Sequence, residues 1–205
     1  MPTLLEQAQA GIITPAIATV AADEGVDPEL LRRRVAAGRV VIPQNNRRTF
    51  HPMGIGEGLR TKINANIGTS TSHFSIEEEL VKMGVSIEAG ADSVMDLSTG
   101  GDLLTVRRQL LDACPVMMGA VPIYFLAAEL AKQKRDLVDF TVDELFDAIE
   151  QQCASGIDYI TVHCGTTRSA LAQLENSGRQ MGIVSRGGSL ITAWMKLNEI
   201  GRAHV

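Results

Sequence analysis

The sequence predicts an α/β fold with a parallel TIM-type (β/α) barrel, cut after about five strand–helix units and preceded by a short helical extension. Five short apolar segments recur at a spacing of about thirty residues, which is the length of one such unit. Amphipathic segments with capping residues lie between them. A complete barrel needs eight units and about 250 residues, and the chain has 205. An open doubly wound sheet is the alternative arrangement.

Composition and charge exclude several classes of protein. Hydrophobic residues make up 45% of the chain and charged residues 21%, as in ordinary globular proteins. The net charge of −5 argues against nucleic acid or an anionic membrane as a partner. The apolar runs are too short to cross a bilayer, and the N-terminal residues lack the pattern of a signal peptide. We therefore expect a cytoplasmic protein.

The cysteines give no sign of a disulfide framework or a metal site. There are three, Cys114, Cys153 and Cys164, widely spaced and without a Cys-x-x-Cys pair. An odd number at such spacing argues against disulfides, and no zinc or iron–sulfur motif is present. Each is interpreted as a small buried residue.

Residues 1–58 predict the helical extension and a loop. Thr14-Pro15 and Asp27-Pro28 each place a capping side chain before a proline at the first helical position, which favours a helix start. A further short helix is expected from Thr3. Residues 44–52 are polar and basic and predict a loop.

Residues 59–198 predict the first part of the barrel. The expected strands are 62–68, 93–97, 116–124, 158–163 and 182–185. The expected helices are 75–89, 102–113, 125–134, 142–155, 167–177 and a partial helix at 190–197. The final segment, 199–205, fits neither pattern and back-translates to a common sequencing adapter. We interpret it as a non-native tail.

Polar or unusual residues lie at the carboxyl ends of the predicted strands, and parallel strands bring such ends to one face. These residues are Asn66, Met95 with Asp96, Tyr124, His163, and Ser185 with Arg186. Each has a structural alternative: Met95, Tyr124 and His163 as packing residues, and Asp96 as a cap of the following turn. The convergence of all five ends is what favours a ligand site.

Residues 185–188, Ser-Arg-Gly-Gly, give the most specific local signal. A glycine pair after a strand lets backbone N–H groups approach an anion, and serine and arginine add donors. Phosphate suits such a loop, above all where a helix begins. The alternative is a tight turn with a solvated arginine. Residues 98–101 have a similar composition, but there the turn is the favoured interpretation.

Taken together, these segments resemble the phosphomethylpyrimidine synthase family of thiamine biosynthesis. The resemblance runs from about residue 11 to residue 197. It rests on the segments 11–14 (GIIT), 62–68 (KINANIG), 75–79 (SIEEE), 90–100 (GADSVMDLSTG), 121–124 (VPIY), 156–163 (GIDYITVH) and 183–188 (IVSRGG).

The resemblance implies a radical S-adenosylmethionine enzyme that rearranges aminoimidazole ribotide into hydroxymethylpyrimidine phosphate. It implies that the substrate-binding positions are Asn66, Met95, Tyr124, His163, Ser185, Arg186 and Gly187. Ser185, Arg186 and Gly187 would hold the ribotide phosphate. Asn66, Tyr124 and His163 would contact polar groups of the imidazole and ribose, and Met95 would shape the pocket. No catalytic residue or metal ligand is assigned in this chain.

The family also implies a 4Fe–4S cluster, S-adenosylmethionine and zinc, whose ligands are not in this chain, and a homodimer. The chain alone is therefore expected to be an inactive fragment. Residues 44–48 depart from the family's usual loop, which leaves the function of that loop open. Two other functions remain open: hydroxybenzimidazole synthase of anaerobic cobamide biosynthesis, and a non-catalytic phosphate-binding half-barrel.

Overall fold

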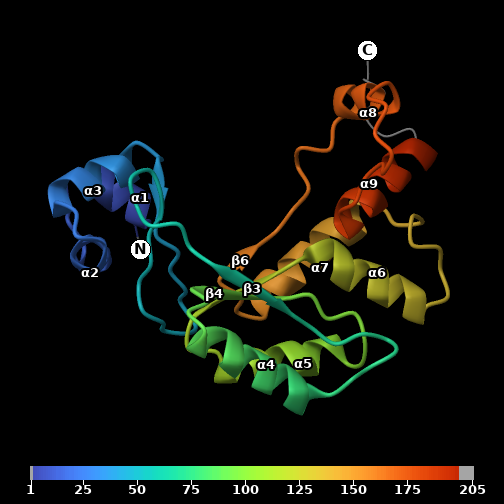
Figure 1. Ribbon diagram of the computed structural model, residues 1–205, viewed down its shortest axis with the longest axis horizontal. Helices are drawn as coiled ribbons and strands as arrows, with labels where there is room; N and C mark the ends of the chain where they lie inside the picture. Colours follow the sequence, from blue (N-terminus) through green and yellow to red (C-terminus); the bar gives the residue numbers. More distant parts are fainter. Residues whose placement is uncertain (1, 199–205) are drawn as a thin grey trace.

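The computed structural model describes residues 2–198, and Figure 1 shows their arrangement. The predicted tail, 199–205, lies outside the described residues. In chain order the elements are α1 (Leu4–Gln9), α2 (Pro15–Glu24), α3 (Pro28–Ala36), β1 (Val40–Val41), β2 (Ile55–Gly56), β3 (Asn64–Ile67), α4 (Ile76–Glu88), β4 (Ser93–Asp96), α5 (Leu103–Ala113), β5 (Met117–Ala120), α6 (Pro122–Lys132), α7 (Val142–Ala154), β6 (Tyr159–Ile160), α8 (Arg168–Glu175) and α9 (Arg186–Leu197).

The first three helices lie together, apart from α8 and α9 (Figure 1). Thr3, Thr14 and Asp27 precede them, and each side chain accepts a hydrogen bond from the backbone N–H three residues on. These caps satisfy donors that a helix start leaves free. Ile17 and Leu31 are fully buried where the helices meet, and β1 and β2 pair antiparallel beside them. The predicted helix starts are confirmed.

A four-stranded parallel sheet forms the centre, in the order β3-β4-β5-β6. Neighbouring strands are consecutive in the chain and are joined by helices, as in the predicted strand–helix units. One row across the sheet aligns Asn66, Met95, Gly119 and Tyr159. The α/β class and the parallel pairing are thus confirmed.

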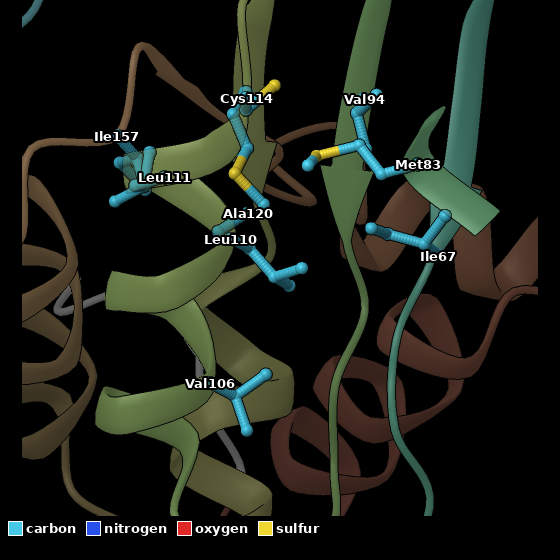
Figure 2. Close-up of a cluster of buried hydrophobic side chains, with 10 residues drawn as sticks. Ile67, Met83, Val94, Val106, Leu110, Leu111, Cys114, Ala120 and Ile157 are labelled. Carbon is cyan, nitrogen blue, oxygen red and sulfur yellow. The ribbon is translucent and has the colours of Figure 1, made fainter. Parts of the chain in front are cut away.

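One face of this sheet is apolar because alternate residues of a strand point to the same side. Ile67, Val94 and Met118 pack there against α4 and α5, which contribute Met83 and Leu110 among others. Figure 2 shows these helical and strand side chains turned toward one another. The residues between them, such as Asn66 and Met95, therefore face the opposite side.

That opposite face is concave. The Tyr159 hydroxyl on β6 donates a hydrogen bond of 2.7 Å to Oδ1 of Asn64 on β3. In a flat sheet three strand spacings would separate these strands, roughly 14 Å, and their side chains would stand parallel to one another. The bond therefore requires a sheet that curls about this face.

A second core lies where α6, α7 and α9 pack together. The ring of Trp194 stacks on that of Phe140 with centroids 4.8 Å apart. Its Nε1 donates to the Phe140 carbonyl at 2.7 Å, which satisfies the polar atom that burial of the indole would otherwise isolate. These contacts fix α9, and with it the residues at its start, against the sheet units.

The basic loop 44–52 ties the N-terminal part to the last strand. Nδ2 of Asn45 donates to Oδ1 of Asp158 at 2.7 Å, and Arg48 pairs with Oδ2 of the same carboxylate. The backbone N–H of Met118 on β5 also donates to Oδ2, at 2.7 Å. This loop, whose function the sequence left open, is an anchor.

Several predicted strands differ from the structure. The strand expected at 116–124 ends at Ala120, because Pro122 has no N–H for the sheet and instead starts α6. Tyr124 is therefore in the first turn of a helix. The fifth strand, expected at 182–185, does not form among the described residues: this segment pairs with no other strand, and α9 begins at Arg186 rather than at 190. The described sheet therefore has four strands where five were predicted.

The strand expected at 158–163 also shortens, to Tyr159–Ile160. His163 consequently lies in the loop after β6. Among residues 2–198 no helix combines the length and the apolar character needed to cross a membrane.

Candidate functional site

A cavity of about 410 Å³ opens at the carboxyl edge of the sheet. Asn66 of β3, Tyr124 of α6 and Arg186 of α9 line it together. The loops that follow β3 and β4 supply a further part of its wall, with Gly68, Thr69, Ser70, Leu97 and Thr99. Three residues predicted from separate parts of the sequence thus share one cavity, at the edge where parallel sheets hold ligands.

The two loops are held rigidly together. The N–H of Thr69 donates to Oγ of Ser98 at 3.1 Å, and Oγ1 of Thr69 donates to the Gly100 carbonyl at 2.8 Å. Gly68 has φ 148°, and a Cβ there would lie 2.5 Å from the backbone nitrogen of Ser98. Only glycine fits this close approach. The rim of the cavity is therefore fixed before any ligand enters.

Tyr124 and Arg186 line the part of the cavity wall that α6 and α9 contribute. The guanidinium carbon of Arg186 lies 5.3 Å from the centroid of the Tyr124 ring, within cation–π range. This contact joins the first turn of α6 to the first turn of α9. It holds a positive charge at the cavity while leaving the guanidinium N–H groups available for an anion.

His163, Ser185 and Gly187 form a second group beside the first. Nε2 of His163 lies 3.2 Å from Oγ of Ser185. That hydroxyl caps α9 by accepting from the Gly188 N–H at 3.2 Å. A Cβ on Gly187 would lie 2.1 Å from Cε1 of His163, so the histidine ring occupies the space that a side chain would need. Arg186, between Ser185 and Gly187, connects this group to the cavity.

Met95 and Asp96 differ in their surroundings. Met95 is half-buried beside Asn66 in the sheet register, and Oγ1 of Thr161 lies 3.7 Å from its sulfur. Asp96 is buried: its Oδ1 accepts from the Ser98 N–H at 2.9 Å, and its Oδ2 lies 3.4 Å from Nε of Arg107. The turn-capping interpretation of Asp96 is the one the structure favours.

Sequence reasoning missed Lys82. It lines the cavity from α4 and pairs with Glu79, whose Oε2 accepts the Gly68 N–H at 2.7 Å. The only signal was the Glu79–Lys82 spacing of three on a predicted helix, which is indistinguishable from an ordinary surface pair. Because the charge of Lys82 is paired with Glu79, Arg186 is the side chain that makes the cavity suited to an anionic ligand.

The described cysteines do not fit an iron–sulfur site. Cys114 is buried, its thiol donates to the Val116 carbonyl at 3.3 Å, and burial raises the pKa of that thiol. Cluster ligands are thiolates. Cys153 and Cys164 are exposed, and in the part of the chain from 2 to 198 no three His, Cys, Asp or Glu side chains are grouped to hold a metal.

The geometry defines an α/β protein with a pocket at the carboxyl edge of its parallel sheet, lined by Arg186 and Lys82 among others. Residues 3–202 match the radical SAM ThiC family, and the chain belongs to that family.

Similar proteins of known name support this assignment to the family. A phosphomethylpyrimidine synthase of Moorella thermoacetica is 52% identical over 198 residues, which is 96% of this chain and 46% of that protein. The synthase of Syntrophus aciditrophicus is 46% identical over the same shares. A synthase of Thermus thermophilus is 51% identical over 94% of this chain and 45% of its own. The chain thus spans about half the length of the relatives it matches.

Proposed function

We propose that this chain is the substrate-binding half of a phosphomethylpyrimidine synthase, which converts aminoimidazole ribotide to hydroxymethylpyrimidine phosphate in thiamine biosynthesis. The observation that carries the proposal is the convergence of Asn66, Tyr124 and Arg186 on one cavity at the carboxyl edge of the sheet. The names of the relatives support the same reaction.

The ribotide phosphate would bind at the start of α9. Ser185 caps this helix, and Arg186 and Gly187 form its first turn. Free N–H groups and the helix dipole favour an anion at such a position. Arg186 adds charged donors at the cavity, where the charge of Lys82 is already paired with Glu79. A dianionic phosphate would thus find its main cationic partner in Arg186.

The imidazole and ribose would lie toward the sheet. The amide of Asn66 and the hydroxyl of Tyr124 offer both donors and acceptors there. His163 contacts Ser185 and would reach a ribose oxygen from the same side as the phosphate. Met95, in register with Asn66, would form the apolar floor beneath the ring.

The same proposal includes closure of the sheet into a barrel and the division of the chain into domains. The curvature implied by the Tyr159–Asn64 bond supports a sheet that closes into a TIM barrel, with residues 1–58 as the extension and 59–198 as the first units. We extend the proposal to a cytoplasmic homodimer. S-adenosylmethionine and an iron–sulfur cluster follow from the family. Because the described cysteines do not fit a cluster, we assign its ligands, and those of zinc, to the remaining half of the full-length enzyme.

A hybrid enzyme tests the reaction. It joins residues 3–198 of this chain to the remaining half of the Moorella thermoacetica relative, and it is purified and reconstituted without oxygen. With aminoimidazole ribotide and S-adenosylmethionine we expect hydroxymethylpyrimidine phosphate as the product. Formation of hydroxybenzimidazole instead would assign the chain to the cobamide branch.

Arg186→Ala tests the binding site in the same hybrid and in the 205-residue chain. Loss of charged hydrogen bonds to phosphate should weaken ribotide binding about 10- to 100-fold in calorimetric titration. Arg33→Ala, on the exposed side of α3, is the matched control and should leave binding unchanged. Equal binding by both variants would remove the phosphate from this site. Binding of inorganic phosphate without binding of the ribotide would favour the half-barrel alternative.

A further inference from the structure

Three side chains from three strands meet on the concave face, below Asn66. Oδ1 of Asn64 accepts from the Tyr159 hydroxyl at 2.7 Å and from Oγ of Ser93 at 2.9 Å. Nδ2 of Asn64 donates to Oδ1 of Asn66 at 2.9 Å. The contacts form a connected path from β6 and β4 to the residue on β3 that lines the cavity.

The structure fixes the direction of each bond. It places Oδ1 of Asn64 beside the hydroxyls of Tyr159 and Ser93, to which it can act as acceptor, and Nδ2 of Asn64 beside Asn66. Asn66 then uses its carbonyl oxygen to accept this bond. Its own NH₂ group takes no part in this bond, and Asn66 is one of the residues that line the cavity. Asn66 thereby offers donors, rather than its acceptor, to a ligand.

Tyr159 is held in place for this contact. Its ring passes over β5 at Gly119, where a Cβ would lie 2.3 Å from the ring carbon Cε2. Any larger residue at 119 would push the ring away from Asn64. Burial also raises the pKa of the Tyr159 hydroxyl, which keeps it protonated and able to donate.

We propose that Asn64 and Tyr159 are positioning residues that orient the Asn66 amide, so that its NH₂ group donates to an acceptor atom of the bound substrate. This inference rests on the proposed function for the identity of the ligand, but the orientation itself belongs to the free protein. Asn64 and Asn66 are linked directly by this bond, and Asn66 lines the cavity. The bond therefore sets the direction in which the Asn66 amide presents its groups.

A ligand-free measurement tests the orientation. In the isotope-labelled 205-residue chain, Tyr159→Phe should shift the side-chain NH₂ resonances of both Asn64 and Asn66 and speed their exchange with water. Ser86→Ala, which removes a hydroxyl bonded to the Lys82 carbonyl on α4, is the control and should leave them unchanged. If Tyr159→Phe moves only Asn64, the path does not extend to Asn66 and the proposal is wrong.

A double-mutant cycle tests the consequence for binding. Tyr159→Phe should weaken ribotide binding about 3- to 10-fold in the hybrid enzyme, the worth of one neutral hydrogen bond. In an Asn66→Ala background the same change should have no further effect, because the two act as one unit. A merely structural Tyr159 would give the same factor in both backgrounds, which would overturn the inference.

Asn64→Asp gives the sharpest variant because it keeps the shape but removes the NH₂ donor. Asn66 should then turn its own NH₂ group toward the new carboxylate and present its carbonyl to the ligand. Binding should fall at least as far as with Asn66→Ala, whereas unchanged binding would contradict the proposal. If the unmutated hybrid binds no ribotide, the proposed function fails, and the resonance experiment alone decides the orientation.

Discussion

On one face of the parallel sheet, Ile67, Val94 and Met118 pack into helices α4 and α5. On the other, the alternate residues of the same strands, Asn64 and Ser93, hydrogen-bond to one another and to Tyr159. The first face is dry and gains its stability from burial of apolar surface. The second is open and gains little from burial, but its groups have defined directions. The apolar core and the proposed ligand-binding face are thus divided by strand parity, and a slip of one residue in register would exchange them.

The largest change in the free energy of unfolding should come from a substitution on the apolar face of the sheet. Leu110 is fully buried between α5 and the sheet, so Leu110→Ala should lower the free energy of unfolding by about 2–5 kcal/mol in urea denaturation. Leu104→Ala on the same helix, where the side chain is 44% exposed, should stay within about 0.5 kcal/mol of the unmutated chain. Equal effects at the two positions would mean that this face is not the main core.

The next largest change in the free energy of unfolding should come from a substitution on the concave face of the sheet. Gly119→Ala places a methyl group against the Tyr159 ring, and such overpacking should cost about 1–3 kcal/mol of unfolding free energy. The penalty should shrink in a Tyr159→Ala background, where the ring is gone. Gly84→Ala on α4 has no atom within 4 Å of the new carbon and should be neutral or stabilising. A penalty at Gly119 that persists without the ring would refute the assigned contact.

The smallest effect should be a dependence of stability on pH that comes from the titration of Tyr159. Burial is the largest cause of its raised pKa, above the ordinary value of 10.0. The folded state therefore holds this proton more tightly than the unfolded state. The stabilisation is fully present below about pH 10 and is lost as pH rises through the folded-state pKa.

Two tyrosines, Tyr124 and Tyr159, make this titration simple to assign. In a Tyr124→Phe background the near-ultraviolet absorbance of tyrosinate should rise only above the ordinary range. Tyr159→Phe should flatten the alkaline end of the stability curve. A tyrosinate signal that rises at or below about pH 10 would show that Tyr159 is not buried in the way described.

Local chemistry predicted much of this molecule. Thr14 and Asp27 precede prolines, which are favoured at the first position of a helix, and the helices start there. Pro122 behaves in the same way: the expected strand ends before it and α6 begins there. Residues 182–185 have apolar character, but a strand also needs a neighbouring strand to pair with, and no local pattern reports one.

The site was predictable in part from the ends of the predicted strands. Asn66 lies near the carboxyl end of a strand that forms, and it lines the cavity. Arg186 also lines the cavity, although the strand predicted before it does not form. The bond from Tyr159 to Asn64 was not predictable, because it depends on curvature accumulated over four strands. Lys82 was missed for a related reason: its orientation toward the cavity depends on the packing of α4, not on its spacing from Glu79.

The contact between Asn45 and Asp158 also implies an order of events as the chain is synthesised. The two residues are 113 positions apart, and ribosomes add about 5–20 residues per second. The N-terminal helices therefore leave the ribosome roughly 5–20 s before the carboxylate that fastens their loop. During that interval Arg48, whose partners include Asp158 and the Cys114 carbonyl, must remain solvated. The N-terminal extension therefore cannot form its contacts with Asp158 until synthesis has reached the fourth parallel strand.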